Sequence, residues 1–128
     1  MDCSQPKLPL SEWTKAAQVV YEVGKNLQQQ LGEELLLTED LQQGIERLGG
    51  YTRGAILPTD YCYNRMNKAP FSFRFPVLEW VGRGKFRYLG PNYNYTGPIY
   101  WKPRGEAERQ VGEWKSGVCN LEEDPRND

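Results

Sequence analysis

The hydrophobic pattern of the first part of the chain predicts two amphipathic helices. Between residues 10 and 31, apolar or small residues recur at alternating intervals of four and three positions, which places them on one helical face. They are Trp13, Ala17, Val20, Gly24, Leu27 and Leu31. We expect Ser11 to cap this helix and Gly32 to end it.

A second helix is predicted from Thr38, its expected N-cap, to the glycines Gly49 and Gly50. Glu39 and Asp40 fall in the first turn, where negative charge suits the helix dipole. The residues expected to face the core are Leu41, Ile45 and Leu48.

The stretch "LPTDYCYNRMNKAPF", residues 57–71, predicts a third and shorter helix. Thr59 is its expected N-cap and Pro70 its end. Helical spacing puts Cys62, Met66 and Ala69 on the side that faces the core. The residues on the opposite, outward side are Tyr61, Asn64, Arg65 and Lys68.

After residue 70 the hydrophobic period changes to two, which predicts β-strands. "FSFRF", residues 71–75, is the first, and "VLEWV" and "KFRYL" form a hairpin around the loop "GRG". The expected register pairs Val81 with Lys85, Trp80 with Phe86, Leu78 with Tyr88 and Glu79 with Arg87. A bulge at a glycine would shift this register by one residue. A further strand is expected at residues 99–102, whereas residues 105–118 fit either a helix or an irregular strand.

Together these elements predict an α+β domain of winged-helix type, with three helices packed on a small antiparallel, aromatic-rich sheet. We expect one domain over residues 1–118 and a disordered acidic tail over residues 119–128. In a winged helix the third helix enters the major groove of DNA and the hairpin touches the backbone. Against this, the connection between the second and third helices is longer than in a typical helix-turn-helix.

The net charge of −1 conceals a strong asymmetry along the chain. Residues 1–48 hold four basic and eight acidic side chains, residues 49–104 hold nine and two, and residues 105–128 hold three and seven. The central block also contains 13 of the 16 aromatic residues. A basic, aromatic-rich block between acidic flanks favours an anionic partner such as nucleic acid, although a solvated basic face above an aromatic core has the same composition.

Several chemistries are excluded by composition. The chain has no histidine, so it offers no His-based nucleophile or acid–base pair. It also has no CxxC motif, and we therefore expect no zinc site. We further expect no other metal, no cofactor and no enzymatic activity. The three cysteines, Cys3, Cys62 and Cys119, are odd in number and far apart, and no apolar run is long enough to span a membrane. These features indicate a cytoplasmic protein.

The candidate function is non-catalytic binding of nucleic acid, with duplex DNA as the expected form. The outward side of the third helix would reach base edges, and the hairpin would contact phosphates. The aromatic residues Tyr88, Tyr93, Tyr95, Tyr100 and Trp101 could stack unpaired bases, and Tyr93 and Tyr95 are the two expected in an exposed loop. The predicted binding residues are Tyr61, Asn64, Arg65, Lys68, Arg83, Lys85, Arg87, Tyr93, Lys102 and Arg104.

The alternative is a protein-interaction or regulatory module without nucleic-acid binding. In that interpretation the Trp13 stripe of the first helix mediates dimerisation or binds a protein partner, and the acidic ends engage a basic protein. Clustering of Arg65, Arg83, Lys85 and Arg87 on one exposed face would favour DNA. Scattering of these residues, or their burial in ion pairs with the acidic flanks, would favour the alternative.

Three stretches carry a resemblance to a known family: "ILPTDYCYNRMNKA", "VLEWVGRGKFRYLGPNYNYTGPIYWKPRGE" and "VGEW". They resemble an uncharacterised bacterial domain that occurs as small standalone proteins and beside restriction-type or HNH nucleases. The resemblance covers roughly residues 35–115 and leaves the first helix outside. It implies, by association with nucleases, DNA handling or phage defence, and it brings no established binding residues.

Overall fold

The computed structural model describes residues 9–66 and 75–122. Within these ranges the chain forms two α-helices, two short 3-10 helices and two β-sheets of three and four strands. In chain order the elements are η1 (Leu10–Glu12), α1 (Lys15–Leu31), β1 (Leu36–Leu37), α2 (Thr38–Gly49), η2 (Pro58–Tyr61), β2 (Arg65–Met66), β3 (Leu78–Gly82), β4 (Lys85–Tyr88), β5 (Gly97–Trp101), β6 (Arg109–Lys115) and β7 (Val118–Leu121).

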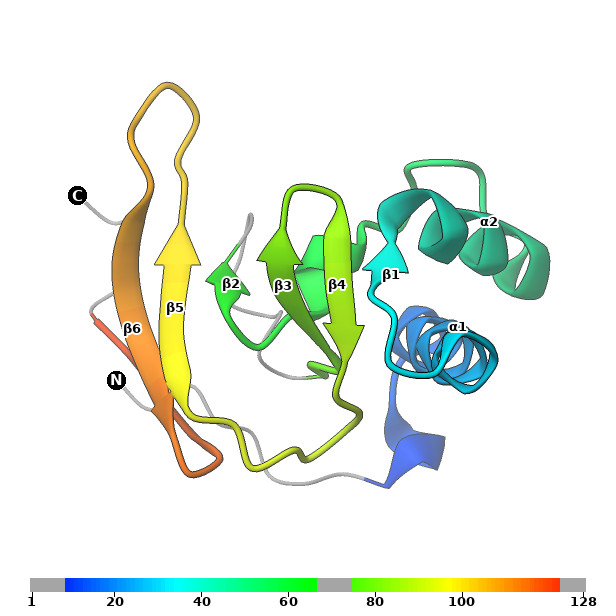
Figure 1. Cartoon of the computed structure of the whole chain (residues 1–128), viewed down its shortest axis with the longest axis horizontal. Coiled ribbons are helices and arrows are strands. Elements are labelled where there is room, and N and C mark those ends of the chain that lie inside the picture. Colours follow the sequence, from blue (N-terminus) through cyan, green and yellow to red (C-terminus); the bar gives the residue numbers. More distant parts are fainter. Residues whose placement is uncertain (1–8, 67–74, 123–128) are drawn as a thin grey trace.

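The two sheets differ in their strand order but meet side by side. The smaller sheet has the order β1-β4-β3 and is antiparallel, and the larger has the order β2-β5-β6-β7. Only the β2–β5 pair of these ladders is parallel. In Figure 1 the strands β6, β5, β2, β3, β4 and β1 follow one another from left to right, with α1 and α2 beyond β1.

The segment from Tyr61 to Met66 joins the two sheets into one row. At its start it pairs in parallel with β3: the Tyr63 amide donates to the Leu78 carbonyl at 2.8 Å, and the Val77 amide donates to the Tyr61 carbonyl at 2.9 Å. At its end it becomes β2 and pairs with β5 instead, where Arg65 lies opposite Tyr100. One short segment therefore serves as a strand of both sheets.

Asn64 stands at the point where the segment passes from one sheet to the other. Its side-chain amide donates to the Trp80 carbonyl at 2.8 Å, and its side-chain oxygen accepts from the Trp80 amide at 2.9 Å. Its own backbone carbonyl accepts from the Tyr100 amide at 3.0 Å. The Asn64 side chain thus makes the two hydrogen bonds to β3 that a backbone ladder would make, while the Asn64 backbone pairs with β5.

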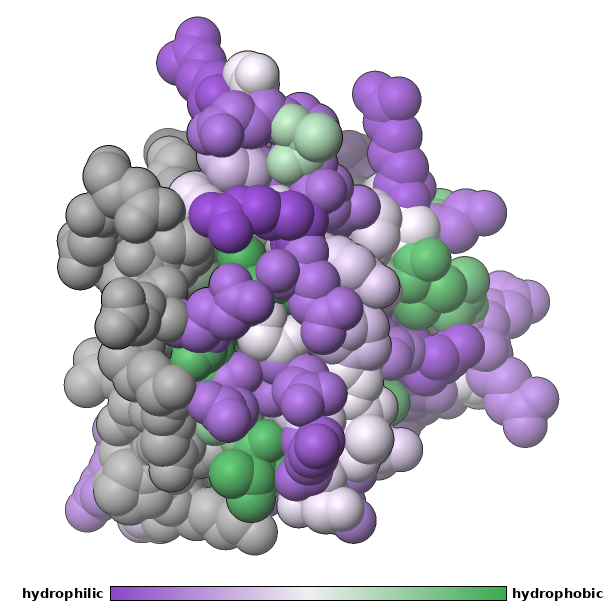
Figure 2. Space-filling view, turned by 90° about the vertical axis from the view of Figure 1, so that its left-hand side faces the viewer, coloured by the Kyte–Doolittle hydropathy of each residue, from purple (hydrophilic) through white to green (hydrophobic). Residues whose placement is uncertain are grey.

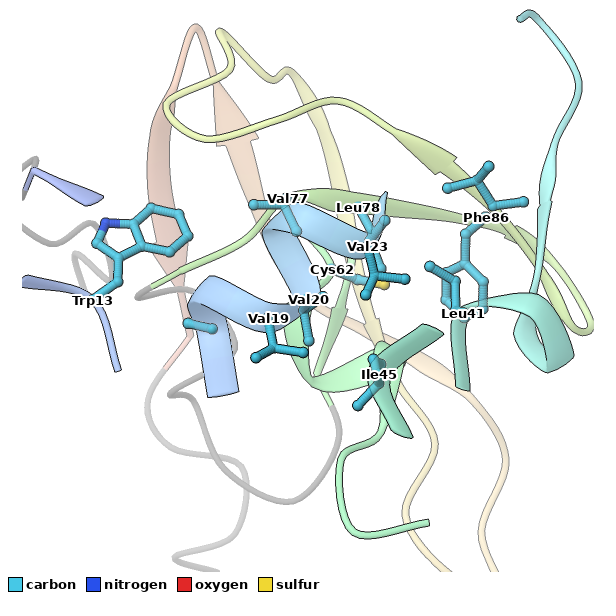
Figure 3. Packing of buried hydrophobic residues seen from close by; sticks show 12 residues of the cluster. Trp13, Val19, Val20, Val23, Leu41, Ile45, Cys62, Val77, Leu78 and Phe86 are labelled. Carbon is cyan, nitrogen blue, oxygen red and sulfur yellow. The ribbon is translucent and has the colours of Figure 1, made fainter. Parts of the chain in front are cut away.

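Two clusters of buried residues flank this junction. The first lies between the helices and the three-stranded sheet, and Figure 3 shows how its side chains converge. It contains Trp13, Ala17, Val19, Val20, Val23, Leu36, Leu41, Ile45, Cys62, Val77, Leu78 and Phe86. The second lies on the four-stranded sheet and contains Tyr63, Met66, Tyr95, Ile99, Val111, Trp114, Cys119 and Leu121. Consecutive residues Cys62 and Tyr63 enter different clusters because successive side chains of an extended segment point to opposite sides.

Both amphipathic helices predicted from the sequence are present, with local differences. The N-cap of α1 is Thr14, whose hydroxyl accepts from the Ala17 amide, and the expected cap Ser11 lies in η1 instead. Gly32 follows α1 with a positive φ of 67°, as the end signal predicted. In α2 the residue Leu48 is 56% exposed, so its predicted inward position is wrong.

The winged-helix prediction is wrong, because the third helix does not form. Only Pro58–Tyr61 is helical, as a 3-10 turn, and the chain then continues in extended conformation. The physical reason is that Cys62 and Tyr63 must fill cores on opposite sides, which helical spacing cannot achieve. The end of the expected helix and most of the expected strand at 71–75 lie outside the described residues.

The β3–β4 hairpin has the predicted register over three pairs, Leu78 with Tyr88, Glu79 with Arg87 and Trp80 with Phe86. An irregularity between Trp80 and Gly82 then changes the last pair, so that Gly82 rather than Val81 lies opposite Lys85. The turn is Arg83-Gly84, with Gly84 at a φ of 73°. The left-handed conformation suits glycine, which has no Cβ to clash.

The C-terminal part of the chain is a meander of three strands. β5 agrees with the strand expected at residues 99–102, and the ambiguous region 105–118 contains β6 rather than a helix. β7 continues to Leu121, and Cys119 and Leu121 are buried, so the sheet extends past residue 118, where the domain was expected to end. Residues 123–128 of the expected tail lie outside the described part.

We predict that Asn64→Ala lowers the free energy of unfolding by about 2 kcal/mol, because it removes two hydrogen bonds and leaves the Trp80 amide and carbonyl without partners. Urea unfolding followed by tryptophan fluorescence measures the change. Asn26→Ala, on an exposed face of α1, is the matched control and should be neutral or slightly stabilising. Equal stabilities of the two variants would show that the Asn64 side chain does not hold the sheets together.

Candidate nucleic-acid interface

The structure distributes the predicted binding residues over several environments. Tyr61 and Asn64 are partly buried in the segment that joins the sheets, and Lys68 lies outside the described residues. Tyr61 packs against the first core, and its burial raises its pKa to about 12. Tyr61 and Asn64 therefore face the body of the protein instead of lying on an exposed helix.

Arg65 is held between two side chains of the protein. Its guanidinium lies over the Trp80 ring, 4.2 Å from the ring centroid, and donates to Glu108 Oε1 at 2.5 Å. Only 18% of its side chain is exposed. A guanidinium stacked on one face and ion-paired at its edge has little capacity left for a phosphate.

Arg87 is also ion-paired, on the face of β3 and β4 that points away from the helices. It donates to Glu79 Oε1 at 2.6 Å, as the predicted register implied, and the Tyr95 hydroxyl donates to Glu79 Oε2 at 2.7 Å. The Glu79 carboxylate on β3 thus binds both Arg87 of β4 and Tyr95 in the loop before β5. The burial of Tyr95 and its contact with this carboxylate raise its pKa.

Four of the predicted cations remain exposed, and the topology brings them to one end of the sheet row. β3 and β5 both run parallel to the joining segment, so their carboxyl ends lie at the same end. The β3–β4 turn and the β5–β6 loop therefore rise together, at the top of Figure 1. The exposed cations on them are Arg83, Lys85, Lys102 and Arg104. Within residues 9–66 and 75–122, no carboxylate lies within ion-pair distance of any of the four.

The two loops share a local design that sequence patterns could have revealed. Each has an arginine followed by a glycine in left-handed conformation, Arg83-Gly84 with a φ of 73° and Arg104-Gly105 with a φ of 79°. The glycine closes the turn and leaves the arginine at its tip. We call the Arg83-Gly84 and Arg104-Gly105 pairs the two arginine tips.

Sequence reasoning missed two side chains near these tips. Arg109, at the start of β6, lies over the Trp101 ring at 5.3 Å from the centroid, and Glu108 pairs with Arg65. Glu106 also lies in the β5–β6 loop, so this loop carries charges of both signs. Both contacts depend on the strand pairing: Arg109 lies directly opposite Trp101 in the β5–β6 ladder, and Glu108, just before β6, reaches Arg65 of β2.

The aromatic residues form a packed cluster, not a row of exposed rings. Tyr63 and Tyr95 stack with centroids 5.2 Å apart, and Trp114 meets Tyr63 edge-on at the same distance. Tyr88 packs on α1 at Gly24, where an ideal Cβ would come within 2.9 Å of the ring. Tyr93 is 46% exposed, as predicted, but Tyr95, also expected to be exposed, is only 6% exposed because it packs in the second cluster. Both residues lie in the loop between β4 and β5, at the end of the row opposite the arginine tips.

Arg53, in the connection after α2, joins the basic block to the acidic N-terminal flank. It donates to Glu46 Oε1 and to Glu39 Oε1, each at 2.9 Å, and these bonds raise its pKa above the usual value. Its positive charge is therefore offset by two carboxylates of α2. The face on the β6 side, shown in Figure 2, is mainly hydrophilic, with hydrophobic residues dispersed among polar ones.

Residues 9–66 and 75–122 contain no group of three or more His, Cys, Asp or Glu side chains placed to hold a metal ion. None of the helices in that part of the chain has the length and apolar character needed to cross a membrane.

Comparison with known proteins places the chain among uncharacterised bacterial proteins. Residues 19–121 match the model of a family described as a domain of unknown function, DUF7225. The chain is 37% identical over 105 residues to the uncharacterised protein YnaC of Bacillus subtilis (strain 168), and the match covers 81% of this chain. It spans only 40% of the length of that relative. No solved structure matches.

These findings confirm the resemblance to an uncharacterised bacterial domain and enlarge it. The match begins inside α1, so the first helix belongs in large part to the unit that the family model describes and was wrongly left outside. Neither description mentions DNA or a nuclease, and that part of the resemblance stays an expectation.

We predict that Arg65 is needed for stability and Arg83 is not. Arg65→Ala should lower the free energy of unfolding by about 1–2 kcal/mol through loss of the Trp80 stack and the Glu108 pair. Arg65→Lys should recover only part of this loss, because lysine keeps the charge but not the planar stack. Arg83→Ala should stay within about 0.5 kcal/mol of the parent. Thermal and urea unfolding of the three variants test this, and equal effects of the two alanine variants would contradict it.

We predict an alkaline loss of stability that depends on Tyr63. Burial raises its pKa to about 12, and its hydroxyl donates to the Gly90 carbonyl at 2.7 Å. The unfolded chain releases this proton near pH 10, so the stability contribution is intact below pH 10. It falls by about 2–3 kcal/mol as the pH rises to 12. Urea unfolding at several pH values should show a shallower decline for Tyr63→Phe, and an unchanged decline would refute the assignment.

Proposed function

Because this chain belongs to the DUF7225 family, whose function is unknown, we propose its function from geometry: it binds the phosphate backbone of nucleic acid, without catalysis, through the two arginine tips. The observation that carries the proposal is the presence of Arg83, Lys85, Lys102 and Arg104 together at one end of the sheet row. All four are exposed, and no described carboxylate neutralises them.

The spacing of the tips suits a duplex better than a single phosphate. The β3–β4 turn and the β5–β6 loop are separated by three strand positions in the row, or about 14 Å. The major groove of B-DNA is about 12 Å wide between its two backbones. Each tip can therefore approach one backbone, and the strand ends between them face the groove.

This mode of binding positions the protein on the backbone and does not by itself select a sequence. Phosphate contacts fix orientation and supply salt-dependent affinity, whereas specificity needs contacts to base edges. The side chains once expected to reach bases, Asn64 and Arg65, are engaged within the protein. The proposed function is accordingly a backbone-binding module of a bacterial protein, and we place it in the cytoplasm.

A protein-interaction or regulatory module without nucleic-acid binding is the second candidate. One observation favours it: acidic residues of both flanks pair with arginines of the basic block. Arg53 pairs with Glu39 and Glu46 of the N-terminal flank, and Arg65 pairs with Glu108 of the C-terminal flank. The Trp13 stripe cannot mediate this interaction, because Trp13 is 7% exposed and belongs to the core.

We predict that the protein binds a labelled random duplex of about 20 base pairs in a salt-dependent manner, and that Arg83→Ala/Arg104→Ala weakens this binding. Fluorescence anisotropy over a salt series measures both affinity and slope. Loss of two phosphate contacts should reduce the slope of log affinity against log salt by about 2. The same series with a single strand shows which form is preferred.

The matched control is Lys25→Ala/Lys115→Ala, which removes the same charge from α1 and from the opposite end of β6. This control should leave the slope unchanged. Equal weakening by both double variants would mean that binding follows total charge and not the arginine tips. Absence of binding to either form at low salt would refute the proposal and leave the second candidate.

A further inference from the structure

An open groove of about 420 Å³ runs between α1 and α2. Its floor is apolar and consists of Val23, Leu27 and Gly44, with Leu48 at one end. Leu48 is 56% exposed, the largest exposed fraction among the large hydrophobic residues described. The two helices pack so closely here that residue 44 must be small, since a Cβ on Gly44 would lie 2.6 Å from Val23 Cγ1.

The rim of the groove on α2 carries one charge of each sign. Asp40 and Arg47 are separated by seven residues, or two helical turns, so they project from the same side of α2 about 10 Å apart. Neither has an ion-pair partner among residues 9–66 and 75–122. This contrasts with Glu39 and Glu46, which project elsewhere on α2 and are both bound to Arg53.

A surface with this arrangement is complementary to itself. When two copies of α2 lie antiparallel about a two-fold axis near Gln43, Asp40 of each copy meets Arg47 of the other. A two-fold interface requires this property, because the same patch serves both sides. The uncharged side chains of Asn26, Gln30 and Gln43 complete the rim and introduce no like-charge contact.

We infer that the groove between α1 and α2 is the docking site for a second copy of this chain, which forms an antiparallel two-fold dimer. Leu48 of each copy is covered in the dimer, and two Asp40–Arg47 pairs set the direction of the helices. The surface shares only Leu27 with the stripe predicted on the first helix, whose Trp13, Ala17 and Val20 are buried within one chain. It shares no residue with the arginine tips, so this inference and the proposed nucleic-acid function can fail separately.

Charge reversal combined with mixing tests the antiparallel geometry. Sedimentation equilibrium should show a concentration-dependent dimer for the parent chain. Asp40→Arg alone and Arg47→Asp alone should each weaken association, because like charges then face each other at both ends. An equimolar mixture of the two variants should associate again. In the mixed dimer the introduced arginine of one chain meets the introduced aspartate of the other, and the remaining parental pair is intact.

A second pair of variants avoids any effect of charge on helix stability. Leu48→Ser should weaken association by about tenfold or more, because each dimer loses two apolar contacts. Val118→Ser is the matched control, since Val118 is 55% exposed and lies on β7, away from the groove. It should leave the dimer unchanged.

Three results would overturn the inference. The first is a parent chain that stays monomeric at about millimolar concentration. The second is a mixture of the two charge variants that associates no better than either alone while both remain folded by circular dichroism. The third is an equal effect of Leu48→Ser and Val118→Ser on the association constant.

Discussion

The pairing of Asn64 with the backbone of Trp80 is the interaction on which the architecture depends. The smaller sheet is not substantial by itself: it consists of one hairpin and a two-residue strand, and an isolated hairpin is marginally stable in water. The segment Tyr61–Met66 gives both sheets an additional neighbour, but it can do so only if it leaves β3 before it joins β5. Where the segment leaves β3, the backbone amide and carbonyl of Trp80 would lose their partners. The Asn64 side chain has both a donor and an acceptor, and it binds both groups.

Folding also changes which charges are available to a partner, compared with what the order of charges along the chain indicates. The charge blocks are separate in sequence, yet folding brings acidic flank residues onto the basic block at Arg53 and Arg65. Within the described part of the basic block, residues 49–66 and 75–104, the cations without an ion pair are the smaller set on the two loops that the junction aligns. The alignment follows from strand direction, because both β3 and β5 run parallel to the shared segment and must therefore end on the same side. The candidate site is a consequence of topology more than of total charge.

Features set by local sequence were predictable, and features set by the junction were not. The stripes of α1 and α2 and the three central pairs of the β3–β4 hairpin depend on periodicity and turn residues, which are visible in the sequence. "YCYNRM" has apolar residues at both helical and strand spacing, so its periodicity could not distinguish them. Tertiary packing decided, with Cys62 drawn into one core and Tyr63 into the other. Asn64 and Arg65 were chosen as binding residues because they are polar beside apolar neighbours, a pattern shared by residues that join strands.

A rigid scaffold with short glycine-closed tips determines how any partner would be bound. Gly84 and Gly105 hold their turns in a defined conformation, so ordering of the loops adds little to the entropic cost of association. The number of cations is small, however, and screened exposed charges bind weakly one at a time. A module of this kind gains affinity chiefly when several copies engage the same molecule, because the second contact then occurs at high effective concentration. Self-association through the α1–α2 groove would supply that second copy. The groove and the tips share no residue, although α2 begins beside one tip, where the Thr38 amide donates to the Gly84 carbonyl at 3.0 Å. A dimer that leaves both pairs of tips accessible would explain how a chain with a net charge of −1 could hold a polyanion.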